Sequence, residues 1–146
     1  MGAQLREDDG GKSQLSQHTR GEVVSVIEHY RDRFNANDAD GLAEIYAPDI
    51  SFVNLAGRTF VGRQAIRDQQ DSGFHGPLVH IRIELDVTGL STLGRDHVLA
   101  LVRQTIIDLN ADGATSASTM TIILDKTSGS WLIRHLQNTP VSAVDA

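Results

Sequence analysis

The chain has 146 residues, enough for one domain that buries its own core without a disulfide or metal, and it contains no cysteine. Thirteen Lys and Arg against nineteen Asp and Glu give a formal net charge of −6, and the scattered basic residues argue against a nucleic-acid partner. No secretory signal or bilayer-length apolar run is recognisable, so we expect a cytoplasmic protein without a membrane partner.

The N-terminal third predicts a tail followed by two helices. Residues 1–19 are polar and contain only two leucines, so we expect a flexible tail before a domain at 20–140 and a second tail at 141–146. A helix from Gly21 to about Ala36 is predicted by an apolar stripe at i, i+4, i+7 and i+11: Val23, Ile27, Tyr30 and Phe34. A shorter helix is expected within 38–47, ending before Pro48.

The remainder predicts a hairpin, a third helix and a sheet. Residues 49–55 and 56–62 are expected to pair as a hairpin, and 63–74 to form a mostly polar helix. Four long strands at 80–90, 96–109, 114–125 and 131–139, joined by tight turns, predict an antiparallel meander. The expected fold is α+β, with three helices on one side of a strongly curved, mainly antiparallel sheet that forms a cone with an internal pocket.

Three segments carry a resemblance to a known superfamily: "YRDRFNANDADGLAEIYAPDISF", "FVGRQAI" and the ending W-x-I-x-x-x-Q-N-T. In this order and spacing, residues 21–139 resemble the nuclear transport factor two-like superfamily, which includes SnoaL-like polyketide cyclases and ketosteroid isomerases. The ending and "FVGRQAIRD" resemble most the SgcJ/EcaC subgroup, some members of which are encoded beside enediyne polyketide genes. The resemblance implies a homodimer formed across the outer face of the sheet.

The resemblance also assigns roles. Tyr30 stands eight residues before Asp38. In ketosteroid isomerases, the tyrosine that donates a hydrogen bond to the developing oxyanion has the same spacing from the aspartate of the loop that follows. Asn54 stands where those enzymes place the proton-shuttling aspartate, and an amide cannot act as a general base. Their second acid has no counterpart, because Thr119, Met120 and Thr121 occupy that part of the fifth strand. Tyr30 is expected to line a pocket or the core, and Asn54 to bind a carbonyl or cap the turn that follows it.

Alternation along the last strand predicts further site residues. Trp131, Ile133, His135 and Gln137 share one face, which we expect to be the inner one, and Leu132, Arg134, Leu136 and Asn138 share the other; a single bulge would exchange the two sets. His135 is a candidate proton carrier or a structural histidine. Of Arg103 and Gln104, which face opposite ways, one should point inward. The expected substrate-binding set is Phe34, Asn54, Arg103, Gln104, Met120, Trp131, Gln137 and Asn138.

Two functions follow from these residues together with the resemblance, which alone implies the polyketide class. The first is a cofactor-independent enzyme that binds an apolar polyketide or polyene intermediate and promotes cyclisation, isomerisation or dehydration, with Tyr30 donating to a carbonyl and His135 moving the proton. The alternative is a non-catalytic module that sequesters an intermediate or contacts a polyketide synthase. No G-x-G-x-x-G fingerprint supports a nicotinamide or flavin, and the histidines have no metal-ligand spacing, so neither a cofactor nor a metal is expected.

Overall fold

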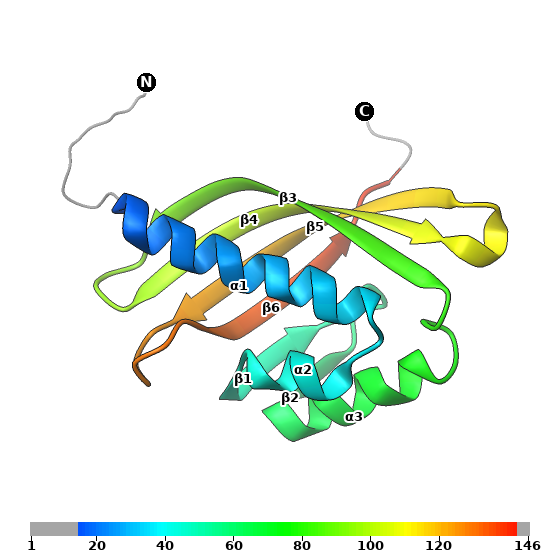
Figure 1. Cartoon of the computed structure of the whole chain (residues 1–146), viewed down its shortest axis with the longest axis horizontal. Coiled ribbons are helices and arrows are strands. Elements are labelled where there is room, and N and C mark those ends of the chain that lie inside the picture. The colour runs from blue at the N-terminus through cyan, green and yellow to red at the C-terminus, as the bar shows by residue number, and fades with distance from the viewer. Residues whose placement is uncertain (1–14, 143–146) are drawn as a thin grey trace.

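The computed structural model describes residues 15–142 as three helices packed on one six-stranded sheet. Helix α1 (Gln17–Asn35) lies across the inner face of the sheet, and α2 (Ala39–Glu44) and α3 (Arg63–Phe74) lie at the side of the sheet where β1 and β2 pair (Figure 1). This confirms the expected α+β cone.

Helix α1 begins earlier than the sequence pattern predicts. The side chain of Ser16 caps it by accepting a 3.0 Å hydrogen bond from the amide of Thr19, so residues 17–19, expected as tail, are helical. The rest of the expected tails falls mostly outside the described residues. Helix α2 is capped by Asp38, whose carboxylate accepts from the amide of Gly41.

The sheet has the strand order β2-β1-β6-β5-β4-β3. The strands are β1 (Tyr46–Val53), β2 (Thr59–Val61), β3 (Ile81–Thr92), β4 (His97–Asp108), β5 (Ala114–Asp125) and β6 (Leu132–Pro140), with a short 3-10 turn, η1 (Leu109–Ala111), between β4 and β5. Strands β3 to β6 form the predicted meander, and β1 joins it by pairing with β6 in parallel.

One bulge in β6 decides which side chains face the helices. Ile123 of β5 pairs with His135, whereas the next residue, Leu124, pairs with Ile133, so Arg134 is an extra residue in β6. Because side chains alternate along a strand, one added residue exchanges the two faces beyond it. Ile133 is therefore buried on the inner face before the bulge, and Leu136 and Asn138 continue that face after it.

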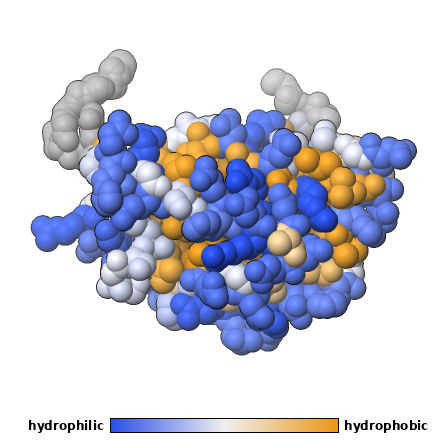
Figure 2. Space-filling model, in the orientation of Figure 1, coloured by the Kyte–Doolittle hydropathy of each residue, from blue (hydrophilic) through white to orange (hydrophobic). Residues whose placement is uncertain are grey.

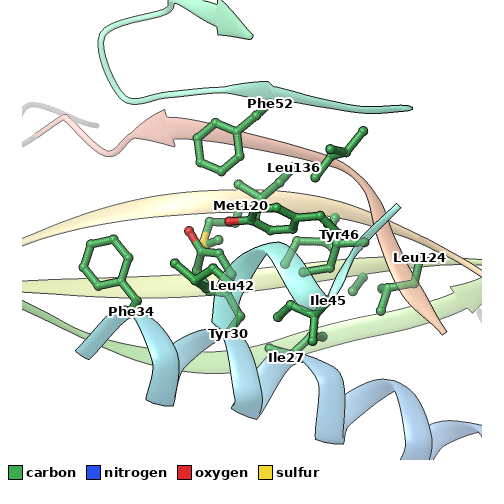
Figure 3. Close-up of a cluster of buried hydrophobic side chains, with 14 of the residues drawn as sticks. Ile27, Tyr30, Phe34, Leu42, Ile45, Tyr46, Phe52, Met120, Leu124 and Leu136 are labelled. Atoms are coloured by element: carbon green, nitrogen blue, oxygen red, sulfur yellow. The ribbon is translucent and has the colours of Figure 1, made fainter. Parts of the chain in front are cut away.

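The core fills the space between α1 and the curved sheet. Val23, Ile27 and Tyr30 of α1 are at most 2% exposed and pack against a cluster that includes Met120, Ile122 and Leu124 of β5. Figure 3 shows Tyr30 and Phe34 pointing from α1 toward the sheet, with Tyr46 and Phe52 of β1 on the other side of the same cluster. The predicted apolar stripe of α1 is thus the face that this helix buries.

Hydrophilic side chains dominate the surface that α1 presents to the viewer in Figure 2, and hydrophobic ones show between them in separate patches. No helix within residues 15–142 is long and apolar enough to cross a membrane.

Candidate active site

A cavity of about 470 Å³ lies between α1, α3 and the inner face of the sheet. Its walls are mainly apolar and include Phe34, Phe52, Phe60, Ile66, Leu78 and Ile83. The loop after β1 contributes Leu55 and Ala56, and the segment between α3 and β3 contributes Pro77. Six polar side chains also line it: Tyr30, Asn54, Gln69, Gln70, Gln104 and Asn138.

Tyr30 is buried, yet its hydroxyl group pairs with none of the described residues. The side chain is 2% exposed, and burial raises the pKa of the hydroxyl above its ordinary value. Among residues 15–142, Asn37 Oδ1 is the one fully buried side-chain polar atom that lacks a partner. The Tyr30 oxygen therefore opens to the cavity, where it is a neutral donor and acceptor at physiological pH.

Tyr46 holds a second donor of the cavity, the amide of Gln70. The hydroxyl of Tyr46 donates a 2.8 Å hydrogen bond to Oε1 of Gln70, which is 5% exposed and lines the cavity. Burial, together with the nearby Tyr30, raises the pKa of Tyr46, while the bond to Gln70 acts against this rise. The amide nitrogen of Gln70 has no partner among the described residues, so the cavity receives a second N–H or O–H donor.

Asn54 lines the cavity and also caps the turn after β1. Its Oδ1 accepts 3.0 Å hydrogen bonds from the amides of Ala56 and Arg58. The two roles expected for Asn54 therefore belong to different atoms. The oxygen holds the turn, and the amide nitrogen remains as a donor beside the cavity.

Gln104 and Asn138 meet at the other polar part of the cavity. Nε2 of Gln104 donates to Oγ of Ser118 at 2.9 Å and to Oδ1 of Asn138 at 3.2 Å, and Oγ of Ser118 lies 3.4 Å from the same Asn138 oxygen. Gln104 is 5% exposed and Ser118 is fully buried. Of the pair Arg103 and Gln104, the glutamine points inward and the arginine is exposed on the outer face.

His135 lies outside the cavity, contrary to the expectation. The bulge at Arg134 turns it to the outer face, where its Nδ1 lies 2.7 Å from Oγ of Ser51. Gln137 is exposed on that face for the same reason. Tyr30 and His135 therefore do not meet in one site, and the expected proton transfer between them has no geometric basis.

Two more expected binding residues belong to the core. Met120 is fully buried and does not line the cavity. Trp131 packs near the start of α1, where its Nε1 donates to Oε1 of Glu22 at 3.2 Å and Lys126 lies 5.7 Å from its ring centroid. Phe34, Asn54, Gln104 and Asn138 are the expected binding residues that do line the cavity, together with Tyr30.

Gln70 and Ser118 were missed, although both carry a signal in the sequence. Gln70 lies four residues after Ile66 and four before Phe74, so it is a polar residue within the buried stripe of α3. Ser118 lies two residues before Met120 on the inward face of β5. A polar residue at a position whose periodicity requires burial is a candidate for a site.

The chemistry of the cavity is that of neutral hydrogen bonding. None of the residues that line it, within the part of the chain described, is Asp, Glu, His, Lys or Arg. No group of three His, Cys, Asp or Glu residues in that part could hold a metal ion. The polar groups supply an O–H and several N–H donors to an otherwise apolar space, so they suit an uncharged ligand that carries acceptor oxygens.

Comparisons with known proteins agree with this fold. A crystal structure from Nostoc punctiforme, described as a domain of unknown function with a cystatin-like fold, has a TM-score of 0.79 at 19% identity and covers 89% of this chain and 82% of that one. A protein from Caulobacter vibrioides with a cystatin-like fold has a TM-score of 0.77 at 24% identity, covering 85% and 90%.

A third structure carries a functional description. It is a candidate dehydratase of the nuclear transport factor two-like family from Streptomyces avermitilis, with a TM-score of 0.69 at 14% identity and coverage of 84% and 96%. No curated protein matches the chain. The family model of the SnoaL-like domain matches residues 27–132, which include the second half of α1, all of α3 and strands β1 to β5, and the chain belongs to this SnoaL-like family.

Proposed function

We propose that this domain binds an uncharged, largely apolar small molecule that places a carbonyl oxygen against Tyr30. One observation carries the proposal: Tyr30 is 2% exposed, and its hydroxyl pairs with no described residue and opens to the cavity. A buried donor without a protein partner is costly to maintain unless a ligand or water completes it. The free amide nitrogen of Gln70, which Tyr46 holds in place, supports a second hydrogen bond to the ligand.

The dimensions and lining support a ligand of the polyketide type. A volume of about 470 Å³ falls within the range typical of small-molecule sites, and aromatic and aliphatic walls suit a polyene or a fused ring. Polyketide intermediates combine such a skeleton with oxygens at intervals. Membership of the SnoaL-like family agrees with this class, and the link to enediyne pathways rests on the resemblance of the "FVGRQAIRD" and Q-N-T segments.

A matched pair of ligands tests whether the cavity recognises a carbonyl oxygen. We would measure binding of a tricyclic aromatic ketone and of the hydrocarbon in which CH2 replaces the carbonyl, by calorimetry and native mass spectrometry. We expect the ketone to bind the natural protein at least about tenfold more tightly, and Tyr30→Phe to remove this difference while the hydrocarbon still binds. Equal binding of both compounds to the natural protein, or binding of neither, would overturn the proposal.

A second function is supported by the same hydroxyl. Tyr30 and Gln70 together would polarise a bound carbonyl and stabilise an enolate-like oxygen, which favours isomerisation, cyclisation or dehydration of an activated substrate. The similar Streptomyces avermitilis structure is described as a candidate dehydratase. Because the described cavity lining holds no carboxylate or imidazole, the protein would contribute hydrogen-bond donation alone, and the proton lost from the substrate carbon would pass to water or to the substrate's own leaving hydroxyl group.

Turnover separates the two functions. Incubation with polyketide-type hydroxyketones and enones, followed by mass spectrometry, should show product if the domain is an enzyme, and Tyr30→Phe should lower the rate about 10²-fold to 10³-fold. Binding without any product would leave a carrier or sequestering module. Product formation that Tyr30→Phe leaves unchanged would contradict the catalytic assignment.

A further inference from the structure

Gln104, Ser118 and Asn138 form a polar triad that leaves one acceptor and one donor unused. The amide nitrogen of Gln104 has two hydrogens, and these go to Oγ of Ser118 and Oδ1 of Asn138. Oδ1 of Asn138 has two lone pairs, which Gln104 and Ser118 both use. The atoms left over are the carbonyl oxygen of Gln104 and the amide nitrogen of Asn138.

This outcome does not depend on how the two amides are oriented. If both amides are reversed, Asn138 donates to Gln104 and to Ser118, and the unused atoms become the nitrogen of Gln104 and the oxygen of Asn138. Reversing one amide alone would place two nitrogens or two oxygens against each other, which is repulsive. In either consistent arrangement the triad presents one N–H donor and one C=O acceptor.

The unused pair faces the cavity. Gln104 and Asn138 both line it, and neither unused atom is among the fully buried atoms that lack a partner within residues 15–142. Gln104 is 5% exposed, so its free oxygen has almost no access to bulk solvent other than through the cavity. A nine-tenths buried amide that points an unpaired atom into a cavity is a built recognition site.

The backbone fixes the members of the triad on one face. Gln104 of β4 lies directly across from Ser118 of β5, and Asn138 of β6 lies across from Met120, two residues further along β5. Asn138 reaches this inner face because the bulge at Arg134 exchanges the two sides of β6. The triad is therefore held by three adjacent strands of the sheet.

We propose that the triad recognises a second part of the ligand: an uncharged group that carries a donor and an acceptor side by side, as in a lactam or other cis amide, or a hydroxyl group next to a carbonyl. This inference rests on the proposed function, because it concerns the same cavity. A carboxylate has only acceptors and would face the unused carbonyl oxygen with no positive charge among the lining residues to balance it. An apolar group would leave the free atoms of both amides without a partner in the cavity.

Two pairs of compounds test the inference and separate its two chemical sources. The first pair is a quinolin-2-one bearing a hexyl chain and its N-methyl derivative, which keeps the acceptor and loses the donor. The second pair is an aryl β-hydroxyketone of similar size and its O-methyl ether. We expect the natural protein to bind the donor-bearing member of at least one pair about tenfold more tightly than its methylated partner. The pair that shows the preference identifies which group the triad recognises, the cis amide or the hydroxyketone.

Substitutions test whether the triad causes this preference for the donor-bearing compound. Gln104→Met and Asn138→Leu keep the size of each side chain and remove its polar atoms, and each should reduce the preference to less than about twofold. Gln137→Met is the matched control, because Gln137 is exposed on the outer face of the same strand. Since the readout is a ratio of two affinities in one variant, a general loss of stability would lower both affinities and leave the ratio unchanged.

The outcomes distinguish this inference from the proposed function. If the compounds bind, and Tyr30→Phe weakens all of them equally, but neither pair shows a preference in the natural protein, the triad is structural and the inference is wrong. A preference that persists in both Gln104→Met and Asn138→Leu would also overturn it. If none of the four compounds and neither the ketone nor its hydrocarbon binds, the proposed function fails and this inference fails with it.

Discussion

Tyr46 and Gln70 are joined by a 2.8 Å hydrogen bond between the phenolic hydroxyl and Oε1 of the amide, and both side chains are buried. The bond connects β1 to α3, the helix that forms one wall of the cavity. With Oε1 of Gln70 accepting the proton of the buried Tyr46 hydroxyl, the amide nitrogen of Gln70 is the atom that opens toward the ligand. A residue that does not line the cavity thereby sets part of its polarity.

Removing this bond should change ligand binding as well as stability. We expect Tyr46→Phe to lower the free energy of unfolding by about 1 to 2 kcal/mol, because the buried Gln70 oxygen loses its donor. The freed amide can then rotate, so affinity for a carbonyl ligand should fall while affinity for the matched hydrocarbon stays constant. Urea unfolding and calorimetry measure the two effects. A loss of stability without any change in the affinity ratio would contradict the orienting role.

Asn35 should stabilise the edge of the sheet. It lies in the last turn of α1, and its side chain makes two hydrogen bonds with the backbone of Ile83, accepting from the amide at 2.8 Å and donating to the carbonyl at 3.0 Å. We expect Asn35→Ala to cost about 1 to 3 kcal/mol of unfolding free energy and to speed hydrogen exchange at the Ile83 amide. Asn110→Ala, on an exposed turn, is the control and should stay within about 0.5 kcal/mol. Unchanged exchange at Ile83 would refute the prediction.

Asp125 should make stability depend on pH in the acid range. Burial opposes its ionisation, but hydrogen bonds from Thr127 and Arg134 and the charge of His97 outweigh this, so the pKa of Asp125 lies below its ordinary value. A lowered folded-state pKa stabilises the protein above the unfolded pKa, about 4, and this contribution disappears as the pH falls through the folded pKa.

The variant Asp125→Asn isolates the contribution of the ionised Asp125 carboxylate to stability. We expect it to be about 2 kcal/mol less stable than the natural protein at pH 7, with the difference shrinking at pH values below about 4. Chemical unfolding at several pH values measures the difference. Asp49→Asn, a substitution at an exposed partner of Arg134, should have a small effect at every pH. A difference for Asp125→Asn that stays constant from pH 7 to pH 3 would contradict the assignment.

His135 and Tyr30 should behave differently when each is changed. Because His135 lies on the outer face and contacts Ser51, His135→Ala should leave ligand affinity within about twofold of the natural protein. Tyr30→Phe should remove the preference for a carbonyl. Binding measurements on both variants with the same ketone provide the comparison. A large loss of affinity or turnover in His135→Ala would restore the imidazole to the site and would contradict the placement of the cavity.

The sequence was sufficient for the order of the elements and for the fold class, although the second helix ends at Glu44 and Tyr46, expected within it, begins β1. The stripe of Val23, Ile27, Tyr30 and Phe34 identified α1 and its buried face, because helical periodicity is a local property of the chain. The alternation of apolar residues predicted the long strands, and β5 has the expected bounds, Ala114–Asp125. Tyr30, Phe34, Asn54, Gln104 and Asn138 were all named from the sequence, and all five line the cavity.

The tertiary structure decided which polar residues meet. Strand register depends on pairing with a neighbouring strand, and because strict alternation puts Leu132 and Leu136 on one face and Trp131 and Ile133 on the other, the alternation of β6 alone does not show where the extra residue at Arg134 falls. That one residue sends His135 and Gln137 outward and brings Asn138 to Gln104 and Ser118. The local sequence sets the periodicity with which side chains alternate along each helix or strand. Contacts between elements that are distant in the chain decide which face of the element points toward the cavity.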